Sequence, residues 1–178
     1  RIIVESGVDF SSLPAGSYEY KIAIDGKWDE NYGSAHYSNP SGANKDGNIL
    51  ITLAQDSQVT FYYNHGTHRI ADSTYYAPIE ADKLPRVIGS FQSGIGEAAD
   101  WSPADARLIM QDSDYDHVYT VTADVYEGDH EYQIALGSDA ASPVHPANRE
   151  ALQLPQDVKV TFSYDAAKHG VAAHFTVP

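Results

Sequence analysis

Seven stretches of the chain alternate apolar and polar residues with a period of two, which is the pattern of half-buried β-strands. They are SYEYKIAI (17–24), NILITL (48–53), QVTFYY (58–63), HVYTVTADV (117–125), HEYQIAL (130–136), KVTFSY (159–164) and HGVAAHFTV (169–177). Turn-forming sequences separate them: NHGT after Tyr63 and DAAKHG after Tyr164 predict hairpin loops, and GANKDGN predicts a longer one. We therefore expect an all-β chain of antiparallel strands.

One stretch departs from this pattern and favours a helix. SPADARLIM (102–110) begins with Ser102, a residue type preferred at helix N-caps. Pro103 follows at the first helical position, where proline is tolerated. The sequence thus predicts one short helix in a chain of strands.

The strand pattern occurs twice along the chain. PAGSYEYKIAIDG, which starts at Pro14, matches YEGDHEYQIALGS, which starts at Tyr126. QDSQVTFYYNHGTHRIA (55–71) likewise matches PQDVKVTFSYDAAKHGVA (155–172). We interpret this self-similarity as a tandem duplication.

The two copies differ in the length of one connection. Tyr20 matches Tyr132 at an offset of 112, and Val59 matches Val160 at an offset of 101, so the second copy is eleven residues shorter between these anchors. The first copy reads DGKWDENYGSAHYSNPSGANKDGN there, and the second reads GSDAASPVHPANR. We therefore expect the second copy to lack the loop that carries Trp28.

The boundary between the copies is expected near residues 80–85, because STYYAPIEADKLPR carries two prolines and little alternation. The expected modules are residues 1–82 and residues 83–178. Short strands with regularly spaced turns in units of this size predict two tandem immunoglobulin-like antiparallel β-sandwiches. Residues 86–112 have no counterpart before Arg1, so the first module is expected to lack its first strand region.

Composition and charge narrow the range of functions. Eleven basic and 25 acidic residues give a formal charge of −14, which repels phosphate backbones and anionic lipids. No apolar run approaches the length of a membrane span. We therefore expect no nucleic-acid partner and no membrane insertion. Cysteine is absent, which excludes a disulfide framework, a thiolate zinc site and a cysteine nucleophile.

The stretch IDGKWDENYGSAHY (24–37) concentrates aromatic and polar side chains without an apolar period. A sugar ring has apolar C–H faces and a rim of hydroxyls, so its binding site needs an exposed aromatic plane with polar groups at the edge. Trp28 and Tyr32 supply such planes on a loop bounded by Gly26 and Gly33. The candidates for binding sugar hydroxyls are Asn31, Glu30, and Lys27 or Lys21.

A structural interpretation of the same residues stays open. Trp28 can plug one end of the sandwich, with Asp29 and Asn31 capping turns. The second tryptophan, Trp101, lies beside the predicted helix, and we interpret it as a packing residue.

Motifs for catalysis or metal binding fail on inspection. HEYQI at His130 lacks the second histidine of a zinc-protease helix and lies in a predicted strand. His65 and His68 flank a hairpin turn and are interpreted as surface histidines. DSDYDH (112–117) opens like a calcium loop, but His117 takes the place of the required glycine, so a turn is favoured, with adventitious calcium as the open alternative. The sequence has no nucleophile elbow or phosphate-binding loop, and we expect no catalytic residue, no metal and no cofactor.

The stretch LPAGSYEYKIAIDGKWDENYG (13–33), followed by residues 48–73, resembles the small starch-binding-type β-sandwich modules of bacterial pullulanases and amylopullulanases. These modules often occur in tandem beside catalytic domains, and they are similar to modules of starch-binding proteins on the surfaces of gut bacteria. The second copy resembles the first half of such a module, including its Asp-Trp-x-Pro signature at residues 100–103. The resemblance implies modules that bind α-glucan or space a catalytic domain and perform no chemistry.

Residues and resemblance together predict a non-catalytic module pair that binds α-glucan such as starch, amylopectin, pullulan or maltooligosaccharides through Trp28 and Tyr32. The resemblance implies a further partner, the catalytic domain of an amylolytic enzyme, and a secreted or cell-surface bacterial protein. The chain begins with Arg1 and its one methionine is Met110, so we expect a processed product or a piece of a longer protein. A purely structural spacer and a hydrolase are the alternatives. Because the second module is expected to lack the Trp28 loop, it is expected to be a spacer or a weaker binder.

Overall fold

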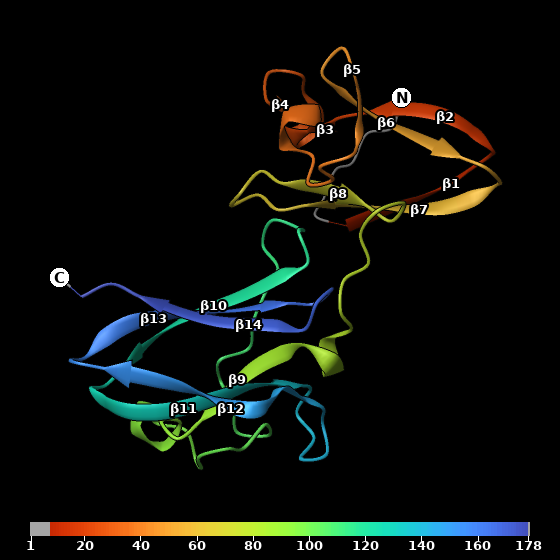
Figure 1. The fold of residues 1–178 in the computed structure, drawn as a ribbon. Helices are drawn as coiled ribbons and strands as arrows, with labels where there is room; N and C mark the ends of the chain where they lie inside the picture. The colour runs from red at the N-terminus through yellow and green to blue at the C-terminus, as the bar shows by residue number, and fades with distance from the viewer. Residues whose placement is uncertain (1–7, 178) are drawn as a thin grey trace. The chain divides into compact units, whose positions relative to one another are not determined.

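The computed structural model describes residues 8–177, which form two compact units (Figure 1). Unit 1 contains the described residues up to Pro78 together with Ser113–Asp116. Unit 2 contains Ile79–Asp112 and the described residues from His117 onward. Between residues 8 and 177 there is no helix with the length and apolar character needed to cross a membrane.

Unit 1 consists of two three-stranded antiparallel sheets and a two-stranded ribbon (Figure 1). One sheet has the order β1-β7-β8, the other has the order β2-β6-β5, and β3 pairs with β4. The strands are β1 (Val8–Leu13), β2 (Gly16–Tyr20), β3 (Ile22–Ala23), β4 (Asn31–Tyr32), β5 (Ala43–Lys45), β6 (Asn48–Leu53), β7 (Ser57–Tyr63) and β8 (Ile70–Asp72). Two 3-10 turns, η1 (Ile24–Gly26) and η2 (Ser34–His36), flank β4.

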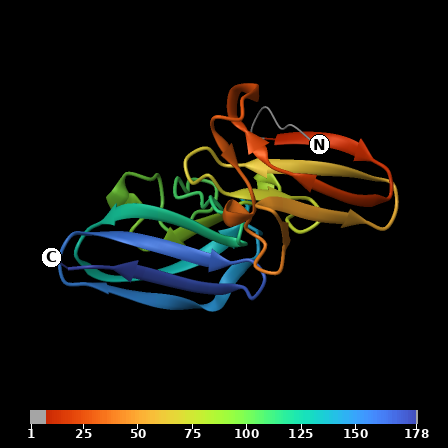
Figure 2. The ribbon, with the colours of Figure 1, turned by 90° about the horizontal axis from the view of Figure 1, so that it is seen from above.

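Unit 2 consists of two three-stranded antiparallel sheets with the orders β12-β11-β9 and β10-β13-β14. The strands are β9 (Pro85–Gly89), β10 (Val118–Val125), β11 (Gly128–Leu136), β12 (Val144–Leu154), β13 (Val158–Asp165) and β14 (Gly170–Phe175). Two 3-10 turns, η3 (Ala81–Lys83) and η4 (Ser93–Ile95), complete it. Figure 2 shows from a second direction that strands dominate each unit.

Each unit encloses a core to which both of its main sheets contribute, as expected of a sandwich. In unit 1 the core residues are Tyr20, Ile22, Ile49, Ile51, Leu53, Val59, Phe61 and Ile70. In unit 2 they include Val87, Phe91, Tyr132, Ile134, Leu152, Leu154, Val160, Phe162 and Tyr164. The predicted all-β class of antiparallel sandwiches is confirmed, and most residues of each of the seven alternating stretches lie in strands; Lys21 separates β2 from β3, and Ile24 begins η1.

The predicted helix over residues 102–110 is wrong, because turns occupy this segment. The backbone N–H and carbonyl of Ser102 both bond to the side chain of Gln92, at 3.2 and 3.0 Å. The Ser102 hydroxyl donates to Asp105 Oδ2 at 2.7 Å instead of capping a helix. These side-chain bonds replace the backbone ladder that a helix would need.

Trp101 packs, as its sequence context predicts. Its indole contacts a small cluster formed by Ile88, Ala106 and Ala135. Arg149 lies on β12, the strand that pairs with β11. Its guanidinium carbon is 3.8 Å from the centroid of the Trp101 ring, so a cation–π contact covers the indole.

Strand register relates residues of the two units. Ile22 pairs with Tyr32, whereas the equivalent Ile134 pairs with His145. Two residues before these isoleucines, Tyr20 of unit 1 pairs with Ile49, and the equivalent Tyr132 of unit 2 pairs with Glu150. Tyr32 in unit 1 therefore occupies the position of His145 in unit 2.

The register corrects the expectation that the second module lacks the loop at the Trp28 position. Seven residues (24–30) connect the paired strands in unit 1, and eight residues (136–143) connect them in unit 2. The shortening lies after the loop, where sixteen residues (33–48) in unit 1 correspond to four (146–149) in unit 2. Unit 2 has thus kept a loop without the tryptophan and lacks a counterpart of η2 and β5.

Candidate functional site

Trp28 lies near the tip of the β3–β4 hairpin of unit 1. The hairpin closes through the Ile24 N–H, which donates to the Glu30 carbonyl at 3.1 Å. Asp25 and Gly26 turn the chain with φ angles of 51° and 67°, a left-handed pair that glycine and aspartate adopt at low cost. No apolar strand position draws the indole inward, and 47% of Trp28 is exposed. The indole therefore meets the condition that the sugar-binding hypothesis requires.

Two of the other predicted residues hold this hairpin in shape. The Asn31 side-chain amide donates to the Trp28 carbonyl at 2.9 Å, which fixes the backbone that carries the indole. The Tyr32 hydroxyl donates to Glu30 Oε1 at 2.6 Å. This hydrogen bond, with the Glu30 charge and some burial, raises the pKa of Tyr32 to about 12, so the hydroxyl remains a donor at neutral pH.

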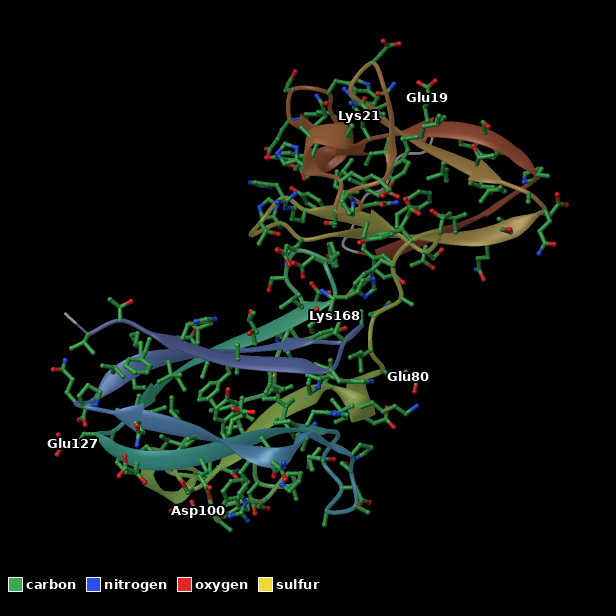
Figure 3. The ribbon with its side chains drawn as sticks, in the orientation of Figure 1. Glu19, Lys21, Glu80, Asp100, Glu127 and Lys168 are labelled. Carbon is green, nitrogen blue, oxygen red and sulfur yellow. The ribbon has the colours of Figure 1, made fainter. Side chains whose placement is uncertain are left out.

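The two predicted lysines occupy different surroundings. Lys27 is exposed, and its N–H donates to the Ile24 carbonyl at 3.0 Å. Lys21, labelled in Figure 3, is half-buried with its aliphatic stem against Gly33. A Cβ added at Gly33 would lie only 3.1 Å from the Lys21 Cε atom. The stem thus lines the connection after β4, whereas Lys27 lies on the hairpin itself.

Tyr32 belongs to a cluster of rings that sequence reasoning missed. Its ring stacks on His68 with centroids 4.3 Å apart and planes 11° from parallel, and it makes a T-shaped contact with His36 at a centroid distance of 5.0 Å. The Tyr63 hydroxyl bonds to His68 Nδ1 at 2.7 Å and fixes the imidazole orientation. One face of Tyr32 is therefore covered by protein, which leaves Trp28 as the more accessible plane.

Unit 2 contains an equivalent cluster at the same register positions. His145 stacks on His169 with centroids 4.3 Å apart and planes 4° from parallel. The Tyr164 hydroxyl bonds to His169 Nδ1 at 2.6 Å, as Tyr63 does to His68. Both copies carry the same five-residue Tyr-to-His spacing across the hairpin, and this repeated spacing is the sequence signal that could have identified the clusters.

The stacked imidazoles of unit 2 give a testable pH dependence. Burial, with repulsion from His169, lowers the pKa of His145 below its ordinary value of 6.5. The folded chain then binds fewer protons at this position than the unfolded chain, so the contribution of the pair to stability is complete above pH 6.5 and is lost as the pH falls through the lowered pKa.

NMR titration of the histidine ring protons is expected to show His145 titrating below pH 6.5. His169→Asn is expected to raise this pKa, because it removes the neighbouring charge while burial remains. A midpoint at or above 6.5 in the unmutated chain would contradict the stacked arrangement.

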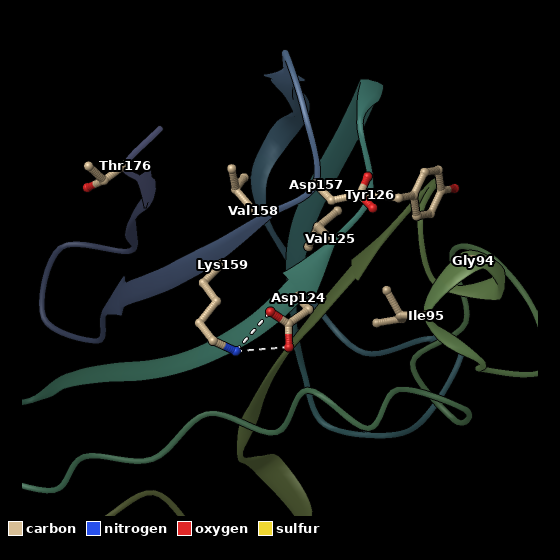
Figure 4. Close-up of a pocket in the computed structure, with 9 residues that line it drawn as sticks. All are labelled: Gly94, Ile95, Asp124, Val125, Tyr126, Asp157, Val158, Lys159 and Thr176. Carbon is tan, nitrogen blue, oxygen red and sulfur yellow. Dashed lines mark hydrogen bonds and ion pairs between the residues drawn. The ribbon is translucent and has the colours of Figure 1, made fainter. Parts of the chain in front are cut away.

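A large surface pocket in unit 2 is less suited to a sugar ring. It encloses about 810 Å³ and lies between the β10–β11 turn, the start of β13 and η4 (Figure 4). Tyr126, the aromatic residue among those lining it, packs one face on Gly94, where an added Cβ would lie 1.9 Å from the ring. Lys159 bonds both carboxylate oxygens of Asp124, at 2.8 and 2.9 Å (Figure 4). The polar rim is therefore already paired, and the pocket offers a single ring.

The chain matches a known protein family. The family described as the pullulanase X25 domain matches residues 8–70 and 85–171, which cover most of the chain. The chain belongs to the pullulanase X25 domain family. The family resemblance noted from the sequence is thereby confirmed.

Similar sequences of X25 type occur in curated amylopullulanases. The chain is 37% identical over 171 residues to the amylopullulanase of Thermoanaerobacterium thermosulfurigenes, covering 93% of the chain and 9% of that protein. It is 36% identical to that of Thermoanaerobacterium saccharolyticum, covering 93% of the chain and 13% of that protein. It is 37% identical over 177 residues to the amylopullulanase of Thermoanaerobacter thermohydrosulfuricus, covering 94% of the chain and 11% of that protein. The chain thus spans only a small part of the relatives it matches.

Among solved structures, a pullulanase from Bacillus acidopullulyticus is similar to the X25 chain, with 25% identity and a TM-score of 0.47. The similarity covers 53% of the chain and 12% of that pullulanase.

Proposed function

We propose that this chain is a tandem pair of non-catalytic X25 modules that binds α-glucan through unit 1 and holds an attached amylolytic catalytic domain at its substrate. We further propose that the parent protein is a secreted or cell-surface bacterial amylopullulanase. Family membership and the alignment with small parts of three amylopullulanases support the accessory role.

The observation that carries the proposal is the exposed indole of Trp28 on a hairpin whose backbone is fixed by Asn31. Preorganisation matters because a loop that is already ordered loses little entropy when it binds. Stacking one sugar face removes roughly 100 Å² of apolar surface from water, which at about 25 cal/mol per Å² corresponds to about 2 kcal/mol. The Glu30–Tyr32 pair and Lys27 lie on the same hairpin and supply polar groups for the sugar hydroxyls.

Trp28→Ala is expected to weaken binding of maltoheptaose by unit 1 about 10- to 30-fold, since about 2 kcal/mol of stacking is lost and each 1.4 kcal/mol is tenfold. Isothermal titration measures the change, and native gels that contain amylopectin provide an independent readout. Phe175→Ala is the matched control, because it removes another exposed aromatic ring from unit 2. Equal retardation of wild type and Trp28→Ala would contradict the role of Trp28, and no retardation of the wild type would favour a purely structural spacer.

The hydrolase alternative is tested with the same purified chain. Incubation with pullulan is expected to release no reducing sugar, because we assign no catalytic residues to either unit. If reducing sugar is still released after further purification of the chain, the proposed non-catalytic role is wrong.

A further inference from the structure

We propose that unit 2 carries a second pyranose-binding site, built on His169 and the pocket beside it. This inference rests on the proposed function, because it takes α-glucan as the ligand of the chain. It assigns to unit 2 a role beyond that of a spacer.

The first argument is that the ring arrangement of unit 1 is reproduced with different residues. His145 replaces Tyr32 at the same register position, and the stacked distance of 4.3 Å is unchanged. The third ring also keeps its place: Tyr164 lies 6.0 Å from His169, and Tyr63 lies 6.1 Å from His68. Packing of the core alone would not require both units to keep the stacked rings and also the tyrosine hydrogen bond that orients the imidazole.

The second argument is an apolar pocket that lies against this cluster. It encloses about 460 Å³, within the range of about 300–1,000 Å³ typical of small-ligand sites. Its lining residues are Ile79, Lys83, Leu136, Pro143, Tyr164, Ala166 and His169. Leu136 and Pro143 lie at the two ends of the loop that corresponds to the Trp28 loop of unit 1. The loop that carries an indole in unit 1 thus contributes aliphatic walls from its two ends in unit 2.

The third argument is that the cluster of unit 2 lacks one ring contact of unit 1 and has a more exposed histidine. In unit 1 the segment 33–48 includes His36, whose ring centroid lies 5.0 Å from that of Tyr32. In unit 2 only residues 146–149 occupy this connection, so His36 has no equivalent. His169 is exposed, whereas its equivalent His68 is half-buried.

The chemistry of this pocket suits one glucosyl unit. The aliphatic walls can contact the C–H face of the ring, and the imidazole of His169 supplies a flat partner. The bond from Tyr164 occupies Nδ1, so Nε2 is the nitrogen that can bond a hydroxyl. Two ion pairs flank the site, Lys83 with Glu80 at 2.6 Å and Lys168 with Asp165 at 3.5 Å, and Figure 3 labels Glu80 and Lys168.

The test is isothermal titration of the whole chain with maltoheptaose, using wild type, Trp28→Ala, His169→Asn and the double variant. Asparagine suits position 169 because its φ is 55°, a left-handed value that asparagine tolerates. We expect two sites in wild type, one in each single variant and none in the double variant. The remaining affinity in Trp28→Ala is expected to fall at least tenfold when His169→Asn is added.

The outcomes separate this inference from the proposed function. If His169→Asn binds like wild type and Trp28→Ala abolishes binding, the unit 2 site is overturned and the unit 1 site stands. If Trp28→Ala has no effect and His169→Asn abolishes binding, the unit 2 site stands and the Trp28 assignment fails. An absence of binding in wild type overturns both.

A second variant guards against a folding defect in His169→Asn. Lys83→Ala removes an exposed polar group at the pocket rim and leaves the core untouched. In the Trp28→Ala background it is expected to weaken maltoheptaose binding severalfold, with unchanged hydrogen exchange in β11 and β13. Unchanged affinity in this variant, together with unchanged affinity in His169→Asn, would overturn the site.

Discussion

Asp72→Ala is expected to lower the free energy of unfolding of unit 1 by about 3–5 kcal/mol, because several donors would lose their acceptor at once and each unsatisfied buried group costs about 1–3 kcal/mol. Asp72 ends β8 and is fully buried. Its Oδ2 atom accepts from the hydroxyls of Tyr20 and Tyr37, at 2.8 and 2.9 Å. Its Oδ1 atom accepts from the Thr74 N–H at 3.0 Å and from the Thr74 hydroxyl. The carboxylate thus joins β8 to the opposite sheet and to the segment after η2.

The size of the effect follows from what alanine would leave behind. Tyr20 is 2% exposed, and burial with the Asp72 charge raises its pKa, so its hydroxyl stays protonated and needs an acceptor. Each buried donor left without a partner costs about 1–3 kcal/mol. Asp72→Asn keeps one acceptor oxygen and is expected to cost less than half as much as Asp72→Ala.

Hydrogen exchange measured by mass spectrometry follows the effect in β2, β6 and β7, with the strands of unit 2 as an internal reference. Asp29→Ala is the matched control, because it removes an exposed carboxylate from the same unit. A loss below about 1 kcal/mol in Asp72→Ala would show that the two tyrosines find other partners or water.

Strands were predictable from the sequence where one face is buried and the other exposed. β7 and β13 alternate in this way, and both were predicted. β9 was expected only as a strand region somewhere within residues 86–112, because all five of its residues are buried and it shows no alternation. β12 was missed for the opposite reason: it lies at a sheet edge, its first eight residues are exposed or half-buried, and it carries Pro146.

The candidate site was only partly predictable for a related reason. An indole with no apolar period around it is expected to lie at the surface, and Trp28 does. The stack of Tyr32 on His68 joins residues 36 positions apart, and local pattern carries no information on such contacts. The change of offset between the copies gave only the net difference in length. The strand register was needed to show that the loop 136–143 is kept and that the connection 146–149 is the part that is shortened.

The second large effect is expected in unit 2, where Gln92→Leu should lower the free energy of unfolding by about 3–5 kcal/mol through several unpaired buried groups. Gln92 is fully buried. Its Oε1 atom accepts from the N–H groups of Gly89 and Ser102, at 3.0 and 3.2 Å. Its Nε2 atom donates to the Ser102 carbonyl at 3.0 Å and to Glu97 at 2.6 Å. One amide thus holds together the segment that the sequence suggested to be helical.

Leucine has nearly the same size as glutamine but can replace none of these bonds, so four polar groups would lose their partner at once. Glu97, which is 5% exposed, would keep only the bond from the Arg107 N–H at 3.0 Å. Hydrogen exchange is expected to rise most in the peptides that cover β9 and residues 90–108. Gln153→Leu, an exposed change on β12, is the matched control and is expected to change stability by less than about 0.5 kcal/mol.

Gln92→Glu separates the polar network from simple packing. It preserves the shape of the side chain but sets a second carboxylate where the amide donated to Glu97 at 2.6 Å. Two carboxylates at this distance cannot both ionise without a large repulsion, so one must take up a proton. The variant is therefore expected to be markedly less stable at pH 8 than at pH 5, whereas Gln92→Leu should lose similar stability at both values. Equal losses for Gln92→Glu at the two pH values would contradict the assignment of this contact.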